Sequence, residues 1–449
     1  MTRVRLTWLI VLAVVLSFAS MTAIAADLPE DVQKWCDMIK ERYGGTTITV
    51  SMGTHPSTDA FRKMVDEFTE LTGINVKWDI ISEPQLRPLH MTQASAGTTS
   101  FDVWMVDGFY ISEYVAKDTL VPISEFTANT ELTPDWFNYQ DIIPAYRQAI
   151  ASVNGVPYAV PTAGESRFIA YRKDLFEQYN IELPQTTDEL LEVARFFAEE
   201  VPGIYGFATR AQRGIFFASG WLHVLYQFSE GWIDQQTGEI LADMPEVIES
   251  LKYWNELIRT GPPDAASYTH EECSSAFMSG DVAIWFDATA IATWLIDPEK
   301  SSVYDQVGFI APPEGPLGRY AGLAGWSLAV PKLTNQKEAA WAFIVWMTSE
   351  FNGPKYVRNG GVLVRDSLLN DPEITATHPD MYRALGDTFA AAKNLTDKGL
   401  VWIPPTWMAN RVLDLAGTLG NQALIGDITE EEACQRLAEE LRRMQAIWN

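Results

Sequence analysis

The sequence contains few of the residues that build metal sites or covalent cross-links. Its 449 residues include three cysteines and five histidines. Cys36, Cys273 and Cys434 show no Cys-x-x-Cys spacing, so at most one pair can close in an oxidising compartment, and the sequence does not indicate which. The histidines are scattered, and the segment 270–274 lacks the second histidine of a zinc-binding helix. We therefore expect no metal and no cofactor.

Basic residues are scarce as well. The chain has 33 Lys and Arg against 59 Asp and Glu, a net charge of −26. Residues 1–26 hold Arg3 and Arg5 and no acid, so their removal takes the charge from −26 to −28. Such a surface repels phosphate backbones and anionic membranes. This argues against nucleic-acid binding and is compatible with a neutral small ligand.

Long apolar runs are nearly absent. The run from Leu6 to Phe18 follows two arginines and precedes Ala23-Ile-Ala25, a pattern typical of a secretory signal peptide over residues 1–26. A membrane anchor is disfavoured because a spanning helix needs about 20 apolar residues. The cleavage point has neither a cysteine nor a lipobox. We therefore expect a soluble protein, exported to a Gram-negative periplasm without a membrane anchor.

Several catalytic signatures are also missing. The chain has no Gly-x-Ser-x-Gly elbow, no Gly-x-x-x-x-Gly-Lys loop, no Gly-x-Gly-x-x-Gly fingerprint and no His-Glu-x-x-His. Asp107, Glu165 and Asp287 could still supply the two carboxylates of a glycosidase. A secreted carbohydrate-active enzyme is therefore one alternative, although we expect a protein that is not an enzyme.

What the chain does have is length enough for two lobes and a regular alternation of strands and helices. A strand over 46–52, an apolar helical stripe from Phe61 to Leu71 ended by Gly73, and a strand over 74–81 make a βαβ unit. Such a unit predicts a mostly parallel sheet with ligands at the carboxyl ends of its strands.

The same patterns continue to the end of the chain. Further strands are predicted over 101–106, 204–208, 282–286 and 307–311, and helices over 29–41, 186–200, 245–259, 271–279, 338–347 and 429–448. Both lobes are therefore expected to be α/β.

Residues 158–176 are the most informative stretch. Two segments of strand-forming residues meet there at Thr162-Ala-Gly164, and the charged residue Glu165 follows directly. A strand that changes lobe at such a joint makes a hinge. The order of Pro161, a small-residue break, Glu165 and Tyr171-Arg-Lys-Asp-Leu resembles the crossing strand of the extracellular solute-binding proteins of ABC importers, sugar-binding family 1. Further crossings are expected at 312–325 and 362–365.

The resemblance implies a two-lobe periplasmic binding protein type II fold of the cluster that contains maltose-binding protein. Each lobe would be a mostly parallel sheet flanked by helices, joined to the other by hinge crossings. The predicted bounds are 46–162 with 324–362 for the first lobe, and 163–323 with 363–449 for the second. The implied function is capture of a sugar or sugar alcohol between the lobes, by a monomer that delivers it to the transmembrane subunits of an ABC permease.

Such a ligand needs hydrogen-bonding side chains for its hydroxyls and flat aromatic surfaces for its CH groups. Asp107 follows a buried-type strand, where the alternative is a helix cap. Glu165 lies at the first crossing, and Arg167 points to the same face of the strand; an ion pair between Glu165 and Arg167 or Arg172 is the alternative. Arg210 follows a strand and could give paired donors to adjacent hydroxyls.

The remaining candidates follow other strands and crossings. Asp287 ends the strand over 282–286. Gly325 would let backbone amides approach the ligand, and Trp326 offers a ring face or packs between lobes; together they resemble the family's small-small-Trp segment. Trp407 could form a second wall. His55, after the first strand, aligns with a ligand-contacting loop of the family or is simply solvated.

A different ligand class remains open at this point. An α-amino acid site pairs an arginine with an acid, and Arg210 with Asp107 or Asp287 could mimic one. An amino acid, peptide or polyamine in the same fold is therefore the second alternative.

Overall fold

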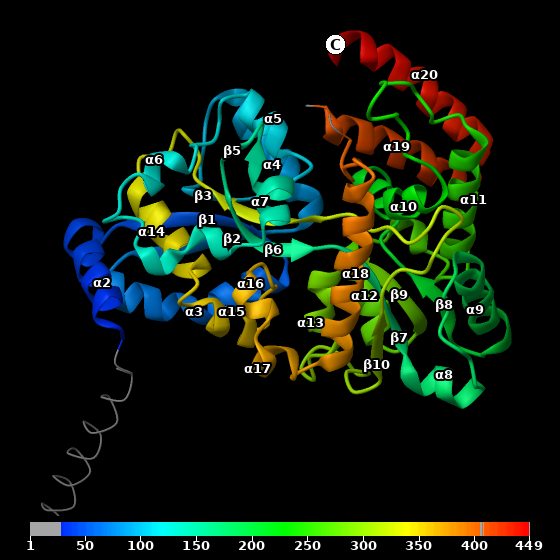
Figure 1. Ribbon diagram of the computed structural model, residues 1–449, viewed down its shortest axis with the longest axis horizontal. Coiled ribbons are helices and arrows are strands. Elements are labelled where there is room, and N and C mark those ends of the chain that lie inside the picture. The colour runs from blue at the N-terminus through cyan, green and yellow to red at the C-terminus, as the bar shows by residue number, and fades with distance from the viewer. Residues whose placement is uncertain (1–27, 405, 407, 449) are drawn as a thin grey trace, which may run out of the picture.

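Two β-sheets, each flanked by helices, organise the chain into two lobes that lie side by side (Figure 1). The computed structural model describes residues 28–404, 406 and 408–448. The predicted signal peptide, residues 1–26, and the candidate Trp407 lie outside these residues. None of the described helices combines the length and the apolar character needed to cross a membrane.

The first lobe is built on a five-stranded sheet. Its strands, in spatial order, are β2 (Asn75–Ile81), β1 (Thr47–Gly53), β3 (Val103–Asp107), β11 (Ala324–Ala329) and β6 (Val160–Glu165). The helices of this lobe are α2 (Glu30–Tyr43), α3 (Pro56–Thr72), α4 (Glu83–Ala96), α5 (Ile111–Ala116), α6 (Ser124–Thr127), α7 (Pro144–Ala151), α14 (Lys337–Thr348) and α15 (Gly353–Arg358). The strands β4 (Ser152–Val153) and β5 (Val156–Pro157) form a separate antiparallel pair.

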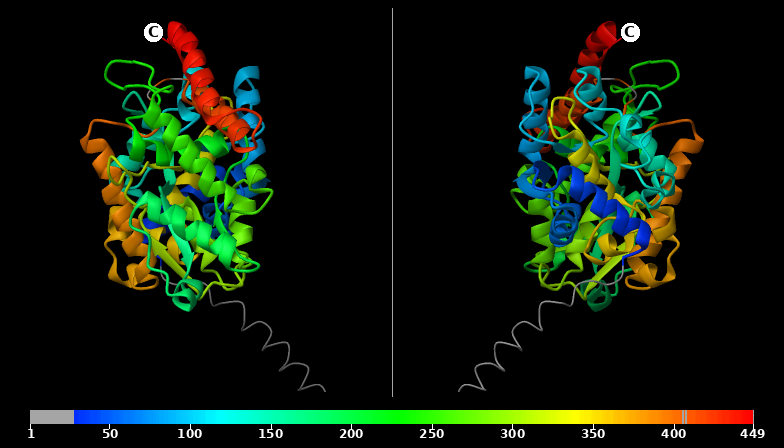
Figure 2. Two further views of the ribbon diagram at one scale, coloured as in Figure 1. Left: turned by 90° about the vertical axis from the view of Figure 1, so that its right-hand side faces the viewer. Right: turned by 90° about the vertical axis from the view of Figure 1, so that its left-hand side faces the viewer.

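The second lobe is built on a four-stranded sheet. Its strands, in spatial order, are β10 (Val307–Ile310), β7 (Arg167–Arg172), β9 (Val282–Ala288) and β8 (Tyr205–Ala208). Its helices are α8 (Lys173–Tyr179), α9 (Thr187–Glu200), α10 (Ile215–Phe228), α11 (Pro245–Arg259), α12 (His270–Met278), α13 (Ala292–Leu295), α18 (Pro379–Asp397), α19 (Ala409–Leu424) and α20 (Glu430–Trp448). Both views of Figure 2 place α20 at the upper end of the molecule. Two short helices, α16 (Asp366–Leu369) and α17 (Pro372–Thr375), follow the third crossing.

Both sheets are mixed, which corrects the expectation of mostly parallel sheets. The βαβ strands behave as predicted, because β1 is parallel to β2 and β3, and β8 is parallel to β9. The strands at the crossings are antiparallel to their neighbours: β11 to β3 and β6, and β7 to β9 and β10. A strand that brings the chain back from the other lobe enters the sheet from the opposite end, so it runs against the strands already there.

Local sequence signals agree well with the elements that form. The stripe of α3 is buried at Phe61, Met64 and Phe68, and Gly73 ends the helix in the left-handed conformation. Thr186 and Glu189 make the predicted capping box of α9. These signals depend only on near neighbours in the chain, so they are readable without the fold.

The first crossing lies slightly later than the small-residue joint. The strand β6 continues through Thr162–Gly164 to Glu165, and β7 begins at Arg167 in the other sheet, so Ser166 is the single residue between them. A Cβ at Gly164 would lie 2.3 Å from the Tyr146 ring. The small residues therefore allow α7 to pack closely against β6.

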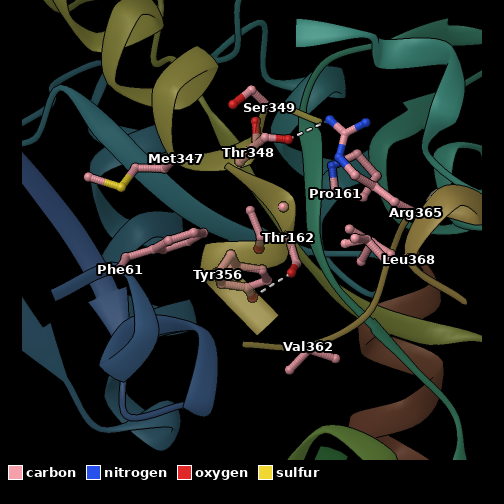
Figure 3. A pocket seen from close by; sticks show the side chains of 12 residues that line it. Phe61, Pro161, Thr162, Met347, Thr348, Ser349, Tyr356, Val362, Arg365 and Leu368 are labelled. Atoms are coloured by element: carbon pink, nitrogen blue, oxygen red, sulfur yellow. Dashed lines mark hydrogen bonds between the residues drawn. The ribbon is translucent and has the colours of Figure 1, made fainter. Parts of the chain in front are cut away.

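A small cavity beside β6 shows how the crossings are braced (Figure 3). The Tyr356 hydroxyl points toward Thr162 and donates to its carbonyl oxygen at 2.7 Å. The buried Arg365 guanidinium, on the third crossing, donates to the carbonyl oxygens of Thr348 and Phe137. These contacts tie the first and third crossings to the first lobe.

The three cysteines, all in the described part of the chain, are free and buried. Cys36 lies in the core of the first lobe, whereas Cys273 and Cys434 lie in the core of the second. The structure therefore contains none of the disulfide pairs that the sequence left open.

Two helical glycines provide a matched test of packing in the second lobe. At Gly386 of α18 a Cβ meets nothing within 4 Å, whereas at Gly220 of α10 it would lie 2.4 Å from the Trp254 ring. We expect Gly386→Ala to raise the free energy of unfolding by about 0.5 to 1 kcal/mol. We expect Gly220→Ala to lower it by about 1 to 3 kcal/mol through overpacking. Urea-induced unfolding measures both changes, and equal effects would contradict the packing of α10 on α11.

Candidate functional site

A cavity of about 30 Å³ lies between the two lobes, where β6, β7 and β11 cross. The residues that line it come from both lobes and from the crossings: Glu83, Arg87, Asp107, Phe109, Glu165, Ser166, Arg167, Arg210, Ser219, His223, Ala288, Ala324, Gly325 and Trp326. Polar and charged side chains form most of this wall. It therefore suits a ligand with many hydrogen-bonding groups.

The structure brings most of the predicted site residues together. Six of them line the cavity: Asp107, Glu165, Arg167, Arg210, Gly325 and Trp326. Two more, His55 and Asp287, contact residues of this wall. Trp407 lies outside the described residues.

Asp287 holds two arginines of the second lobe in place. Arg210 Nε lies 2.8 Å from Asp287 Oδ1, and Arg167 Nη1 lies 3.2 Å from the same oxygen. Burial by itself would raise the pKa of Asp287, but the two guanidiniums lower it to about 2. Asp287 is fully buried behind Arg210 and Arg167. Its carboxylate therefore serves as their counter-ion, and the guanidiniums face the cavity.

In the first lobe the arrangement is reversed, because one arginine, Arg87, pairs with two carboxylates. It donates from Nε to Asp107 and its Nη1 lies 2.7 Å from Glu83 Oε1. Asp107 also accepts the backbone N–H groups of Phe109 and Tyr110, at 3.0 and 3.1 Å. The local capping role that the sequence offered as an alternative for Asp107 is therefore combined with a place in the cavity wall.

Glu165 pairs with a histidine and with neither of the arginines that the sequence suggested. His55 Nε2 lies 2.9 Å from Glu165 Oε1, while Arg167 pairs with Asp287 and Arg172 with Asp174. His55 Nδ1 accepts the backbone N–H of Ser57, so Nε2 carries the proton and donates to the carboxylate. The ring is buried and caps α3, which excludes the solvated alternative.

The second crossing contributes backbone and an aromatic ring. Gly325 has a φ of 138°, and a Cβ there would lie 1.9 Å from the Ala163 carbonyl oxygen, so only glycine fits. Trp326 is 6% exposed, and the Arg87 guanidinium lies 4.8 Å from its ring centroid. One ring thus borders the cavity and packs on a cation of the same wall.

His270 connects the lobes inside the cleft. Its Nδ1 lies 2.8 Å from Glu83 Oε2, and its Nε2 contacts the Thr54 carbonyl oxygen at 3.2 Å. Burial alone would lower the pKa of His270, but the Glu83 carboxylate raises it above the ordinary value. Since both ring nitrogens face acceptors of the first lobe, we assign His270 as the imidazolium cation.

The charges around the cavity balance one another. The carboxylates are those of Glu83, Asp107, Glu165 and Asp287, and the cations are Arg87, Arg167, Arg210 and His270. A buried charge without a partner is costly. A cavity whose own groups already neutralise one another therefore favours a ligand without net charge.

Several wall residues were not predicted from the sequence. Glu83 and Arg87 lie four residues apart on α4, directly after β2, so their position after a strand was an available signal. His223 lies within the apolar helix α10, and Phe109 follows Asp107 by two residues. For His223 no local pattern marks it as a cavity residue, because its neighbours in the helix are buried core.

Comparison with known proteins places the chain in a family. Residues 54–352, more than half of the chain, match the family described as bacterial extracellular solute-binding protein. The chain belongs to this family. The two-lobe fold and the family predicted from the crossing strand are therefore confirmed.

Relatives of this solute-binding protein bind polyols and sugars. It is 27% identical to a mannitol-binding protein of Pseudomonas aeruginosa, over 89% of this chain and 94% of that one. A solute-binding protein of Agrobacterium vitis S4, solved with bound D-mannitol, is 26% identical, with a TM-score of 0.80 and coverage of 90% and 99%. The maltose-bound MalE3 of T. maritima is also 26% identical, with a TM-score of 0.78 and coverage of 89% and 100%.

The protonation of His270 predicts a pH dependence of stability. Its pKa is raised in the folded protein, so its contribution is complete below the unfolded value near 6.5 and is lost as pH rises through the folded value. We expect the deficit of His270→Gln in unfolding free energy to be largest at about pH 5.5 and to shrink toward about pH 9. Urea unfolding across this range measures it.

His378 is the matched control for this experiment. Although His378 is exposed, partial desolvation lowers its pKa, so protonation opposes folding and its effect on stability has the opposite sign. His378→Gln should therefore gain relative to the wild type as pH falls. A deficit of His270→Gln that is constant with pH would show that His270 is neutral.

Proposed function

We propose that this protein captures a neutral polyhydroxy solute, a sugar or a sugar alcohol, between its lobes for an ABC importer. The observation that carries the proposal is the charge balance of the cavity, in which every guanidinium already has a carboxylate within the protein. A neutral ligand can be bound without breaking these pairs. Its hydroxyls can donate to the carboxylates and accept from the arginines, since both kinds of group have several hydrogen-bonding sites.

The amino-acid alternative fits this wall less well. An α-amino acid carries an ammonium and a carboxylate, and each needs an opposite charge inside the site. Of the residues that could mimic such a site, Arg210 binds Asp287 at 2.6 Å, and Asp107 is already paired with Arg87. An amino acid bound here would bring two further charges into a site whose own charges are already neutralised, so the cost of desolvating its ammonium and carboxylate would be poorly compensated.

Closure of the lobes is part of the proposed mechanism. The cavity of about 30 Å³ holds on the order of two water molecules, so a polyol enters only when the lobes part. On closing, polar groups of both lobes meet the ligand together. Because the closed form then binds the ligand more tightly than the open form, the ligand shifts the population toward closure.

The setting of this function follows from the family and the sequence. The signal-peptide pattern over residues 1–26 and membership of an extracellular solute-binding family support a periplasmic location. We infer a monomer that presents its closed form to the transmembrane subunits of a permease. We also infer that it is not an enzyme. The family and the relatives that match this chain are solute-binding proteins, which supports this inference.

A ligand panel tests this proposal. We expect at least one of mannitol, sorbitol, ribitol, erythritol and glucose to raise the unfolding free energy by about 2.7 kcal/mol at a hundred times its dissociation constant. Amino acids at the same concentrations should have no effect. Thermal unfolding measures the shifts, and stabilisation by amino acids alone would contradict the proposal.

The role of Glu165 can be tested with the ligand that this panel identifies. In Glu165→Gln the amide oxygen can still accept from His55, but the charged acceptor for ligand hydroxyls is lost. We expect affinity to fall about 10- to 100-fold, as for a lost hydrogen bond to a charged group. Isothermal titration calorimetry measures it, with Glu199→Gln on the exposed surface of α9 as the control. Equal affinities of the two variants would remove Glu165 from the site.

A further inference from the structure

We propose that the site accepts one small polyol or one monosaccharide and excludes glycosylated forms, because direct contacts between the lobes close the cavity at both sides. His270 is the residue that sets this limit. The inference rests on the proposed function and adds to it the size of the ligand.

The first closing contact is made by His270, the first residue of α12 in the second lobe. Its ring nitrogens reach Glu83 and Thr54, which lie after β2 and β1 at the same edge of the first sheet. The side chain is 2% exposed. Arg210 Nη1 lies 3.7 Å from Glu83 Oε1 and adds a second contact from the same lobe. No room is left between the lobes for a chain of sugars to pass between Glu83 and His270.

The second closing contact is aromatic. Phe109, which follows β3 in the first lobe and lines the cavity, has its ring centroid 5.5 Å from that of Trp402. Trp402 is buried in the core of the second lobe and packs on His223, another residue of the cavity wall. A Cβ at Gly108 would lie 3.2 Å from the Ile403 side chain, so the lobes pack closely here as well.

The crossing strands close the side toward the hinge. Glu165 and Ala324 are paired neighbours in β6 and β11, and both line the cavity. The cavity is thus bounded by the hinge, by the contact of Glu83 with His270 and by the contact of Phe109 with Trp402. A larger ligand fits inside these boundaries only as far as the side chains can rearrange. An additional sugar ring, in contrast, must break one of the contacts between the lobes.

The contact at His270 is the more selective of the two. Displacing His270 from Glu83 separates a buried ion pair and leaves the imidazolium without its partner. We therefore expect a glycosylated ligand to bind at least about a hundred-fold more weakly than its parent compound.

Matched pairs of compounds test this limit on the wild-type protein. Sorbitol is compared with maltitol, mannitol with 1-O-α-glucosylmannitol, and glucose with maltose; each pair differs by one glucosyl ring. Isothermal titration calorimetry measures both members. For whichever parent compound binds, we expect a loss of at least about a hundred-fold for its glucosylated partner.

Two variants assign the limit to His270. In His270→Ala, Glu83 keeps Arg87 and Arg210 as partners, so the carboxylate is not orphaned. We expect the ratio of the two affinities in a pair to move toward equality by about ten-fold or more. His270→Asn, with a smaller change in volume, should give an intermediate ratio.

Asp59→Ala is the matched control. Asp59 of α3 makes a contact between lobes outside the cavity wall, with Trp294 Nε1 at 3.2 Å and Lys300 Nζ at 2.8 Å. Its removal weakens closure for every ligand in the same proportion, so the ratio within a pair should not change. A change in that ratio equal to that of His270→Ala would assign the selectivity to closure in general and overturn the role of His270.

The remaining outcomes separate the two proposals. If a parent compound and its glucosylated partner bind the wild type equally well, the size limit is overturned and the proposed function stands. If no polyhydroxy compound binds while another class of solute does, both are overturned. A hundred-fold preference that His270→Ala reduces and Asp59→Ala preserves supports the limit.

Discussion

Buried ion pairs that each lobe completes for itself are the constraint on which the site depends. Arg87 is neutralised by Asp107 within the first lobe, and Arg210 by Asp287 within the second. Buried guanidiniums need such partners whether the cleft is open or closed. Because these pairs do not cross the cleft, the lobes can part without leaving them unpaired. The arginines are thereby held in fixed positions before a ligand arrives, which reduces the ordering cost of binding.

Contacts that do cross the cleft have a different physical role. Glu83 with His270, and Asp59 with Lys300, break when the lobes separate and are replaced by water. Opening the cleft hydrates both partners of each contact, so breaking it there costs less than displacing His270 inside the closed cleft, where the ring would stay buried without its partner. The crossings themselves are firmly attached on one side, since Arg365 and Tyr356 bond to carbonyl oxygens of the first lobe. In the proposed closure, the second lobe therefore moves relative to strands that are braced in the first lobe.

Elements predicted from local spacing agree with the structure, whereas features decided by contacts between distant parts of the chain were missed. Helix α11 has the predicted bounds, and Gly73 ends α3 as expected, because both depend on local spacing. The mixed character of the sheets was missed, because strand direction is decided by where the chain re-enters a sheet. Asp107 and Glu165 were placed near the cleft by their positions after a strand and at a crossing. Their partners were not predictable from those positions.

By itself the sequence determined the two α/β lobes, the crossings and a chain rich in acids, since periodicity, turn residues and composition are properties of short segments. Only the tertiary structure decided that His270 meets Glu83, that His223 of an apolar helix borders the cavity, and that Asp287 lies behind the arginines. These relations join residues far apart in the chain, and they arise from how two separately packed lobes dock. Docking depends on the shape and charge of whole surfaces, which no local pattern carries.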